Sequence, residues 1–318
     1  MTKKLLSIIL SSIVATSLFV GCSSKTENTS KENASKGKTI SIEHAMGTSE
    51  IPENPQKVVI LTNEGAEALI TLGVKPVGAV TGVTGDWYEH TKKDLEGVKP
   101  LGKESSVNVE AVAALKPDLI IGNKMRHEKI YDQLKAIAPT VYSDTIRGAW
   151  KDNFEFYAKV LNKEAEGNKA LKEYEDKIAS IKETYKDKLN TEISLVRFMP
   201  GKTRIYLGDT FSGTILKEIG FKRPSTQQGT EFVNEIGKER LKEADGDVMF
   251  YFTYDTGDGK GLAREEEWLN DPLFKSLGAV KNNKAFKVDD IIWNTAGGIK
   301  AANLMLDDLT NILKEGKF

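Results

Sequence analysis

The stretch 164–185, EAEGNKALKEYEDKIASIKETY, decides how this chain is organised. Its larger apolar side chains recur every three or four positions, as on one face of an α-helix, and most other positions are charged. The stripe consists of Leu171, Tyr174, Ile178, Ile181 and Tyr185. A helix over about 25 residues, from 164 to 189, would span roughly 37 Å. Because that length matches the width of a whole lobe, the stretch predicts either a long surface helix or a rigid connection between two lobes.

Before this helix, short strands alternate with short helices. The apolar runs predict strands at residues 39–43, 55–61, 74–80, 119–122 and 139–142. Helical spacing predicts helices at residues 64–73, 107–115 and 131–137, with a further helix at 150–161. Asn108 is placed to cap the second of these helices. The alternation predicts a parallel sheet covered on both faces.

After the long helix the pattern starts again. It predicts strands at 191–198 and 245–252 and helices at 212–220 and 239–244. Gly73 and Gly220 end comparable helices, which favours two similar lobes. We therefore expect an α/β fold of two Rossmann-like lobes with a cleft between them. The predicted boundaries are an N-terminal lobe at 39–149, connecting helices at 150–189 and a C-terminal lobe at 190–318.

The N-terminus has the features of an export signal. Lys3 and Lys4 precede an apolar run that ends in Gly21, and Cys22 is the single cysteine of the chain. A basic start, an apolar stretch and a small residue at the cut are typical of a signal peptide, here residues 1–21. The run resembles a bacterial lipoprotein signal with Phe19-Val-Gly-Cys as its lipobox, so Cys22 is the expected lipidation site. The alternatives are a plain secretion signal or one anchor helix, although the run is short and serine-rich for a span.

The expected location is therefore the cell membrane, with the protein lipid-anchored on the extracytoplasmic face. Residues 22–38 are polar and without apolar periodicity, as in a flexible tether. The formal charge is −1, or −3 once the two N-terminal lysines are removed, which argues against nucleic-acid binding. A lipidated single cysteine leaves no disulfide. Three histidines are too few and too scattered for a histidine-rich metal site.

Catalytic motifs are missing from the sequence. It contains no Gly-x-Ser-x-Gly or His-Glu-x-x-His, and its one Gly-x-x-x-x-Gly-Lys match, at 97–103, is followed by Glu104 instead of the serine or threonine of a phosphate-binding loop. The segment 255–261, DTGDGKG, faintly resembles a calcium loop, but its spacing and its final acid do not fit, so we expect a mobile loop. We expect no enzyme activity, no cofactor and no protein-bound metal.

Several segments, taken in order, resemble the ferric-siderophore solute-binding lipoproteins of ABC iron-uptake transporters. The resembling segments are residues 51–61, 67–78, 108–110, 115–121, 137–141 and 271–280. The resemblance covers essentially the whole mature chain. It implies two α/β lobes joined by one long helix, little hinge motion and a monomeric protein. It also implies a ferric siderophore as ligand and an ABC permease with its ATPase as partners.

Arginines and aromatic residues at strand ends are the candidate ligand contacts. Guanidinium groups suit carboxylate or hydroxamate oxygens, aromatic walls suit apolar linkers, and open α/β sheets place ligands at the carboxyl ends of their strands. The candidates are Arg126, Arg147, Trp150, Arg197, Tyr206, Tyr254 and Trp293. For each arginine the alternative is a solvated surface charge. Trp87 could bind ligand or cover a sheet edge, and His127 could donate to a citrate-like carboxylate or cap the next helix.

The resemblance also implies one acid on each lobe that meets the permease. Glu67, six residues before Gly73, stands at the N-lobe position, whereas the corresponding C-lobe position holds Thr214. Glu218 and Glu231 are the remaining C-lobe candidates. The expected ligand is a hydroxamate or citrate-hydroxamate chelate that arrives with its iron already wrapped. The alternatives are a cobalamin or haem binder of the same family or, from another class, a surface-anchored enzyme or adhesin.

Overall fold

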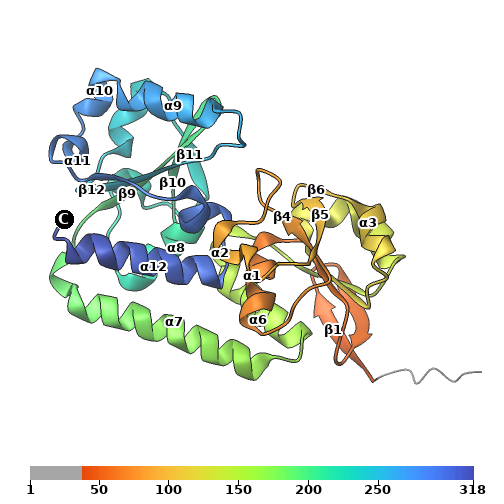
Figure 1. Ribbon diagram of the computed structural model, residues 1–318. Helices are drawn as coiled ribbons and strands as arrows, with labels where there is room; N and C mark the ends of the chain where they lie inside the picture. The colour runs from red at the N-terminus through yellow and green to blue at the C-terminus, as the bar shows by residue number, and fades with distance from the viewer. Residues whose placement is uncertain (1–37) are drawn as a thin grey trace, which may run out of the picture. The chain divides into compact units, whose positions relative to one another are not determined.

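The computed structural model describes residues 38–318, which form two α/β lobes (Figure 1). The N-lobe strands are β1 (Thr39–His44), β2 (Gly47–Pro52), β3 (Val58–Ile60), β4 (Gly78–Thr81), β5 (Lys99–Lys103), β6 (Ser106–Val107), β7 (Leu119–Asn123) and β8 (Thr140–Ser143). Its helical segments are α1 (Asn63–Thr71), α2 (Glu89–Lys92), α3 (Val109–Ala114), α4 (Lys124–His127), η1 (Glu128–Ile130) and α5 (Tyr131–Lys135). The predicted signal peptide, Cys22 and nearly all of the predicted tether lie outside the described residues.

The N-lobe sheet has the order β6-β5-β4-β3-β7-β8, and only its edge strand β6 is antiparallel. All residues of β3, β4, β7 and β8 are buried, as expected for strands with helices on both faces. The hairpin β1–β2 forms a separate pair. Asn108 caps α3 as predicted, since its side chain accepts the backbone N–H of Ala111. The predicted parallel sheet is therefore confirmed in this lobe.

The C-lobe sheet has the order β11-β10-β9-β12-β13. Its strands are β9 (Ile193–Met199), β10 (Lys202–Tyr206), β11 (Val233–Glu235), β12 (Val248–Thr253) and β13 (Ala285–Lys287). Its helical segments are α8 (Phe211–Ile219), η4 (Ser225–Gln227), η5 (Lys238–Ala244), α9 (Lys260–Leu269), α10 (Pro272–Lys275), α11 (Gly278–Lys281), η6 (Ile291–Thr295) and α12 (Ile299–Lys314). Strands β9, β12 and β13 are parallel, whereas β10 pairs antiparallel with both of its neighbours, β9 and β11. This lobe is mixed because a turn at Gly201, with φ of 71°, folds β10 back onto β9.

The lobes are joined by η2 (Arg147–Ala149), α6 (Trp150–Val160), α7 (Glu164–Thr184) and η3 (Lys186–Lys188). Helix α7 has 21 residues and ends at Thr184, earlier than the predicted residue 189. The short 3₁₀ turn η3 follows it. Helix α12 lies beside α7 and packs against α1, so the last long helix of the chain returns to the N-lobe (Figure 1). No helix within residues 38–318 is long and apolar enough to cross a bilayer.

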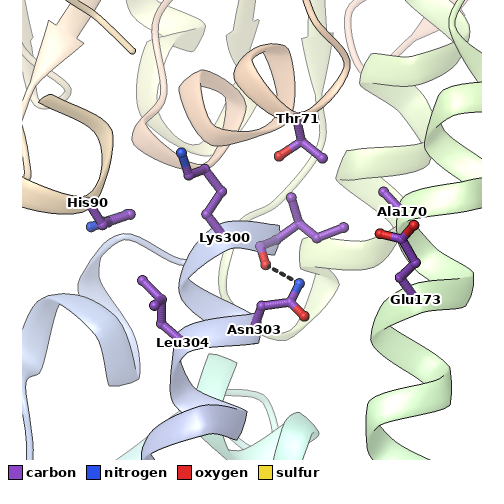
Figure 2. A pocket seen from close by; sticks show the side chains of 8 residues that line it. Thr71, His90, Ala170, Glu173, Lys300, Asn303 and Leu304 are labelled. Atoms are coloured by element: carbon purple, nitrogen blue, oxygen red, sulfur yellow. Dashed lines mark hydrogen bonds between the residues drawn. The ribbon is translucent and has the colours of Figure 1, made fainter. Parts of the chain in front are cut away.

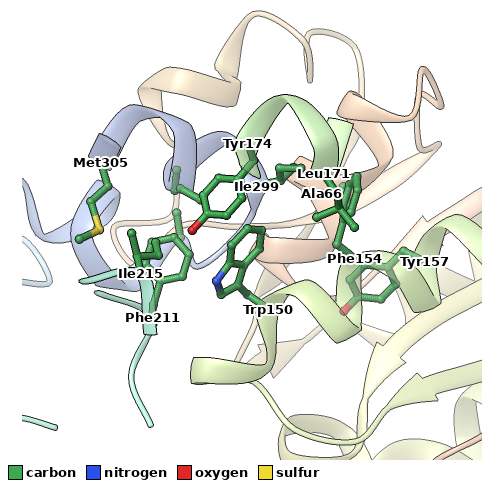
Figure 3. Packing of buried hydrophobic residues seen from close by; sticks show 14 of the residues in the cluster. Ala66, Trp150, Phe154, Tyr157, Leu171, Tyr174, Phe211, Ile215, Ile299 and Met305 are labelled. Atoms are coloured by element: carbon green, nitrogen blue, oxygen red, sulfur yellow. The ribbon is translucent and has the colours of Figure 1, made fainter. Parts of the chain in front are cut away.

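Trp150 lies at the centre of the packing between the lobes (Figure 3). Its ring is edge-on to Tyr174 of α7, with centroids 4.9 Å apart, and 6.0 Å from Phe211 of α8. Only 2% of its surface is exposed, so the prediction that Trp150 contacts ligand is wrong. The apolar ring instead joins the cores of both lobes at their common base. This shared core favours the limited hinge motion that the family resemblance implies.

Candidate ligand cleft

Arg126 lies just after β7, in α4, and its side chain is 44% exposed. Its Nε donates to Oε1 of Glu104 at 2.9 Å, and Glu104 also accepts the backbone N–H of Asn63 at 3.0 Å. The two terminal nitrogens of Arg126 make no hydrogen bond to other residues between 38 and 318. Half of the guanidinium is thus fixed by an acid, while the other half can donate to a ligand.

His127, the neighbour of Arg126, is not available to a ligand. It is 2% exposed; its Nδ1 accepts the backbone N–H of Asn123 and its Nε2 donates to the carbonyl of Glu104 at 2.9 Å. Burial lowers the pKa of His127, which keeps the ring neutral. The predicted contact with a citrate-like group is therefore wrong: His127 instead ties the β7–α4 turn to the segment that carries Glu104.

Arg197 of β9 is the centre of a buried polar cluster. Its Nε and one terminal nitrogen donate to the two oxygens of Asp290 at 2.6 and 2.7 Å, and the other terminal nitrogen donates to the Tyr206 hydroxyl at 2.7 Å. The Tyr254 ring lies 4.8 Å from the guanidinium carbon. Although burial opposes the charge, the Asp290 carboxylate raises the pKa of Arg197 above its ordinary value.

Arg197 and Tyr206 are consequently structural groups rather than free ligand donors. Arg197 is 6% exposed and Tyr206 is fully buried, which corrects their predicted roles. Trp293 is also fully buried, with its ring 4.6 Å from Phe250 and its Nε1 donating to Asp308, so the prediction that it lines the cleft is wrong. The position of Trp293 just before the last helix predicts a cleft wall, whereas packing against Phe250 places the ring in the core.

Arg147 reaches from the end of the N-lobe onto the C-lobe. Its guanidinium carbon lies 4.0 Å from the centre of the Phe232 ring, and a terminal nitrogen lies 3.9 Å from Asp209. Its φ of 83° is a left-handed conformation that non-glycine residues rarely adopt. Such strain is typical of functional sites. One third of the side chain is exposed, so Arg147 keeps its place as a candidate ligand contact.

Tyr88 is influenced by a charged group from each lobe. Its hydroxyl is buried without a hydrogen-bond partner in the described part of the chain. Burial raises the pKa of Tyr88, and the charges of Glu104 and Asp290 raise it further. Glu104 belongs to the N-lobe and Asp290 to the C-lobe, so one carboxylate from each lobe influences this hydroxyl. Trp87 and Tyr254 are half-buried, and their predicted ligand contacts stay predictions.

Two pockets of about 340 Å³ each lie away from these clusters. One is formed by α1, α2, α7 and α12 (Figure 2), and the other lies between β2 and the segment that joins α5 to β8. Neither contains a candidate arginine. We therefore place the ligand site by its convergent polar groups rather than by volume. Within residues 38–318, no three acids, histidines or cysteines are grouped to hold a metal.

The acids predicted to meet a permease differ in exposure. Glu67 is fully buried, with Oε2 accepting the backbone N–H of Ala301 and Oε1 lying 2.5 Å from Nε2 of His90, so its predicted surface role is wrong. Glu218 accepts the Tyr174 hydroxyl and pairs with Lys151 at 3.0 Å. Glu231 is exposed and thus remains the best placed of the three.

Two α/β lobes on a shared base, each with a polar cluster at its strand ends, form the architecture of a two-lobe binding protein. Residues 58–291 match the family model described as periplasmic binding protein, and the chain belongs to that family. The predicted family resemblance and two-lobe fold are confirmed.

Named relatives extend this similarity over nearly the whole chain. The chain is 46% identical to the probable siderophore-binding lipoprotein YfiY of Bacillus subtilis, covering 96% of this chain and 97% of the relative. It is 29% identical to the Fe(3+)-citrate-binding protein YfmC of the same organism, covering 97% and 96%. The solved structure of Staphylococcus aureus SirA with staphyloferrin B is similar with a TM-score of 0.80 at 39% identity, covering 87% of this chain and 99% of SirA.

Proposed function

We propose that this protein is the extracytoplasmic binding component of an ABC iron-uptake transporter and captures a ferric siderophore. The observation that carries the proposal is the similarity to SirA, whose solved structure contains staphyloferrin B. The two chains are 39% identical, and the match covers 99% of SirA. The 46% identity to a probable siderophore-binding lipoprotein supports the same conclusion. On this proposal the protein binds and delivers its ligand without catalysis and needs no cofactor of its own.

The cleft chemistry fits an anionic, partly apolar chelate. Arg126 offers from the N-lobe two nitrogens that have no partner within residues 38–318, and Arg147 offers a partly exposed guanidinium beside the C-lobe. Forked guanidinium donors suit carboxylate and hydroxamate oxygens. Phe232 and Tyr254 supply aromatic surface for linkers. We therefore propose a hydroxamate or citrate-hydroxamate siderophore whose iron arrives wrapped by the chelator.

The membrane partners follow from the same proposal. Lipidated Cys22 would hold a monomeric protein at the extracytoplasmic face, where the permease and its ATPase take up the ligand. With Glu67 buried and Glu218 paired, exposed Glu231 is the acid we propose to meet the permease. A charge-reversal variant, Glu231→Lys, should reduce iron uptake by cells while leaving siderophore affinity unchanged.

The binding proposal is tested by calorimetry on the mature chain carrying Cys22→Ala. The panel contains ferric schizokinen-like, ferrioxamine-like and catecholate chelates, cobalamin, haem and free ferric ion. We expect saturable one-to-one binding of a hydroxamate or citrate-hydroxamate chelate and none of cobalamin or free iron. Tight binding of cobalamin or haem alone would contradict the siderophore assignment, and binding of the catecholate alone would contradict the ligand class.

A further inference from the structure

A buried carboxylate links the two lobes at their base. Glu67 of α1 accepts the backbone N–H of Ala301, in the first turn of α12, at 2.9 Å. Its other oxygen lies 2.5 Å from Nε2 of His90. A Cβ on Gly298 would lie 2.5 Å from Oε2 of Glu67, so a side chain at residue 298 would force the carboxylate to move. Negative charge at a helix N-terminus is favourable because unpaired N–H groups and the helix dipole point toward it.

A second polar contact supports the same junction. Lys300, one residue before Ala301, donates to Asp94 of the N-lobe at 2.5 Å. Figure 2 shows Lys300 on α12 beside the N-lobe, with His90 lining the same pocket. The N-terminus of α12 is therefore fixed to the N-lobe by one buried and one partly exposed acid.

The same helix N-terminus is joined directly to the polar cluster of the C-lobe. Segment η6 (Ile291–Thr295) is π-helical and ends four residues before α12 begins. Thr295 and the preceding Asp290 both accept hydrogen bonds from Arg197. Between η6 and α12, Gly297 has φ of 69°, a conformation that suits glycine. Short π-helical segments often occur at functional sites.

We propose that Glu67 is a positioning residue for ligand binding. By fixing the N-terminus of α12 it holds η6, and through η6 it holds the Asp290–Arg197 pair on which the C-lobe side of the proposed ligand site is built. This inference rests on the proposed function, since it concerns the cleft that binds the siderophore. On this proposal Glu67 acts by holding α12 in place, and it needs no contact with the permease.

The test compares Glu67→Ala with Glu67→Gln. Glutamine keeps an oxygen that accepts from Ala301 and an amide that donates to the His90 ring, so it should behave like the parent. Alanine removes both bonds. In ligand-free protein we expect Glu67→Ala to speed amide hydrogen exchange at Ala301 and across residues 291–296 at least tenfold. We also expect it to weaken binding of the ferric siderophore at least tenfold, mainly through faster dissociation.

Leu134→Ala is the matched control. Leu134 of α5 is fully buried in a separate N-lobe cluster, so its loss lowers the melting temperature without touching α12. It should leave exchange at 291–296 and affinity unchanged. If Glu67→Ala is insoluble, Gly298→Ala provides the second variant: its backbone is extended at φ of −112°, and its methyl group displaces the carboxylate.

The outcomes separate the two proposals. If Glu67→Ala or Gly298→Ala behaves like Leu134→Ala, with a lower melting temperature but parental exchange at 291–296 and parental affinity, Glu67 is an ordinary structural residue and the positioning role is refuted. If the parent protein binds no ferric siderophore, the proposed function fails, while the exchange measurement still decides whether Glu67 holds η6.

Discussion

Arg126 and Arg197 both lie at strand ends, but the acids beside them give them different roles. Their positions after β7 and on β9 could be predicted from the sequence because apolar runs locate strand ends. Their partners could not, since Glu104 is 22 residues and Asp290 is 93 residues away along the chain. Local patterns carry no information on such long-range pairs. The burial of Trp150 and Trp293 could not be predicted for the same reason. The residues that cover each ring, such as Phe211 and Phe250, are distant along the chain.

Arg126→Ala should weaken siderophore binding and leave stability nearly unchanged. One charge-assisted hydrogen bond contributes about 1.5–3 kcal/mol, or roughly 10- to 150-fold in affinity. Because the side chain is 44% exposed, the melting temperature should fall by no more than a few degrees. Titration calorimetry and thermal melts measure the two effects. Lysine should restore affinity only in part, and an unchanged affinity in the alanine variant would remove Arg126 from the site.

Arg197→Ala should show the opposite balance. The substitution leaves Asp290, whose side chain is 10% exposed, without its counter-charge. Removing one partner of a buried pair costs about 3–5 kcal/mol. Denaturant unfolding should therefore show a large loss of stability, before any effect on ligand is considered. A stability equal to that of Arg126→Ala would show that this pair is much less important to the fold than its geometry indicates.

Glu64 makes the stability of the protein depend on pH. Its carboxyl is buried and accepts from the Tyr157 hydroxyl at 2.9 Å and the Asn153 amide at 2.8 Å. Burial raises the pKa of Glu64 from 4.5 to about 8, against the opposing effect of these hydrogen bonds. Between those pH values the unfolded chain has released this proton and the folded chain retains it. This contribution to stability is therefore complete below pH 4.5 and declines as the pH rises toward 8.

Glu64→Gln should remove that dependence. The amide oxygen still accepts both hydrogen bonds, but no proton is released. Relative to the parent, the variant should gain stability as the pH is raised from 5 to 8, by on the order of 1–3 kcal/mol. Urea unfolding at several pH values measures this. Parallel stability curves for parent and variant would exclude Glu64 as the titrating group.

At the scale of elements, the two lobes begin their equivalent helices in the same way. Thr62 accepts the backbone N–H of Gly65 at the start of α1, and Thr210 accepts that of Gly213 at the start of α8. Both glycines lie where a Cβ would clash with the preceding strand or loop. The shared Thr-x-x-Gly pattern is present in the sequence and could have aligned the lobes from their helix starts, in addition to the helix ends at Gly73 and Gly220.

Thr62→Ala and Thr210→Ala should each destabilise the protein by about 1 kcal/mol, the typical effect of losing an N-cap. Serine at either position should retain most of the stability because it keeps the hydroxyl. Denaturant unfolding of the four single variants measures these differences. Alanine variants as stable as the serine variants would contradict the capping role of the hydroxyls.

Other elements show where sequence patterns were insufficient. Strand β10 is short and follows a tight turn, so its antiparallel pairing with β9 depends on Gly201 rather than on apolar spacing. The segment 255–261, predicted as a mobile loop, is held by Asp255, whose carboxylate accepts the backbone N–H groups of Gly257, Gly259, Gly261 and Leu262. These bonds fix the start of α9, a role that the comparison with calcium loops did not suggest.

At the scale of the whole molecule, attachment to the membrane is the feature most easily separated from folding. Cys22 is the only cysteine, so its substitution breaks no disulfide. Cys22→Ala should release the protein from the membrane into the medium or periplasm with unchanged thermal stability. Fractionation with detection by antibody measures the distribution. Full retention of the variant on membranes would contradict lipidation at this residue.

The return of α12 to the N-lobe has a consequence for recombining this protein with its relatives. A chimera joined just after η3 would exchange residues 190–318 as one unit and would place a foreign α12 against the native α1. Glu67 would then meet an unrelated helix start, and the face of α1 would pack on side chains that never evolved beside it. Hybrids that change ligand preference should therefore keep the native residues 297–318 with the native N-lobe.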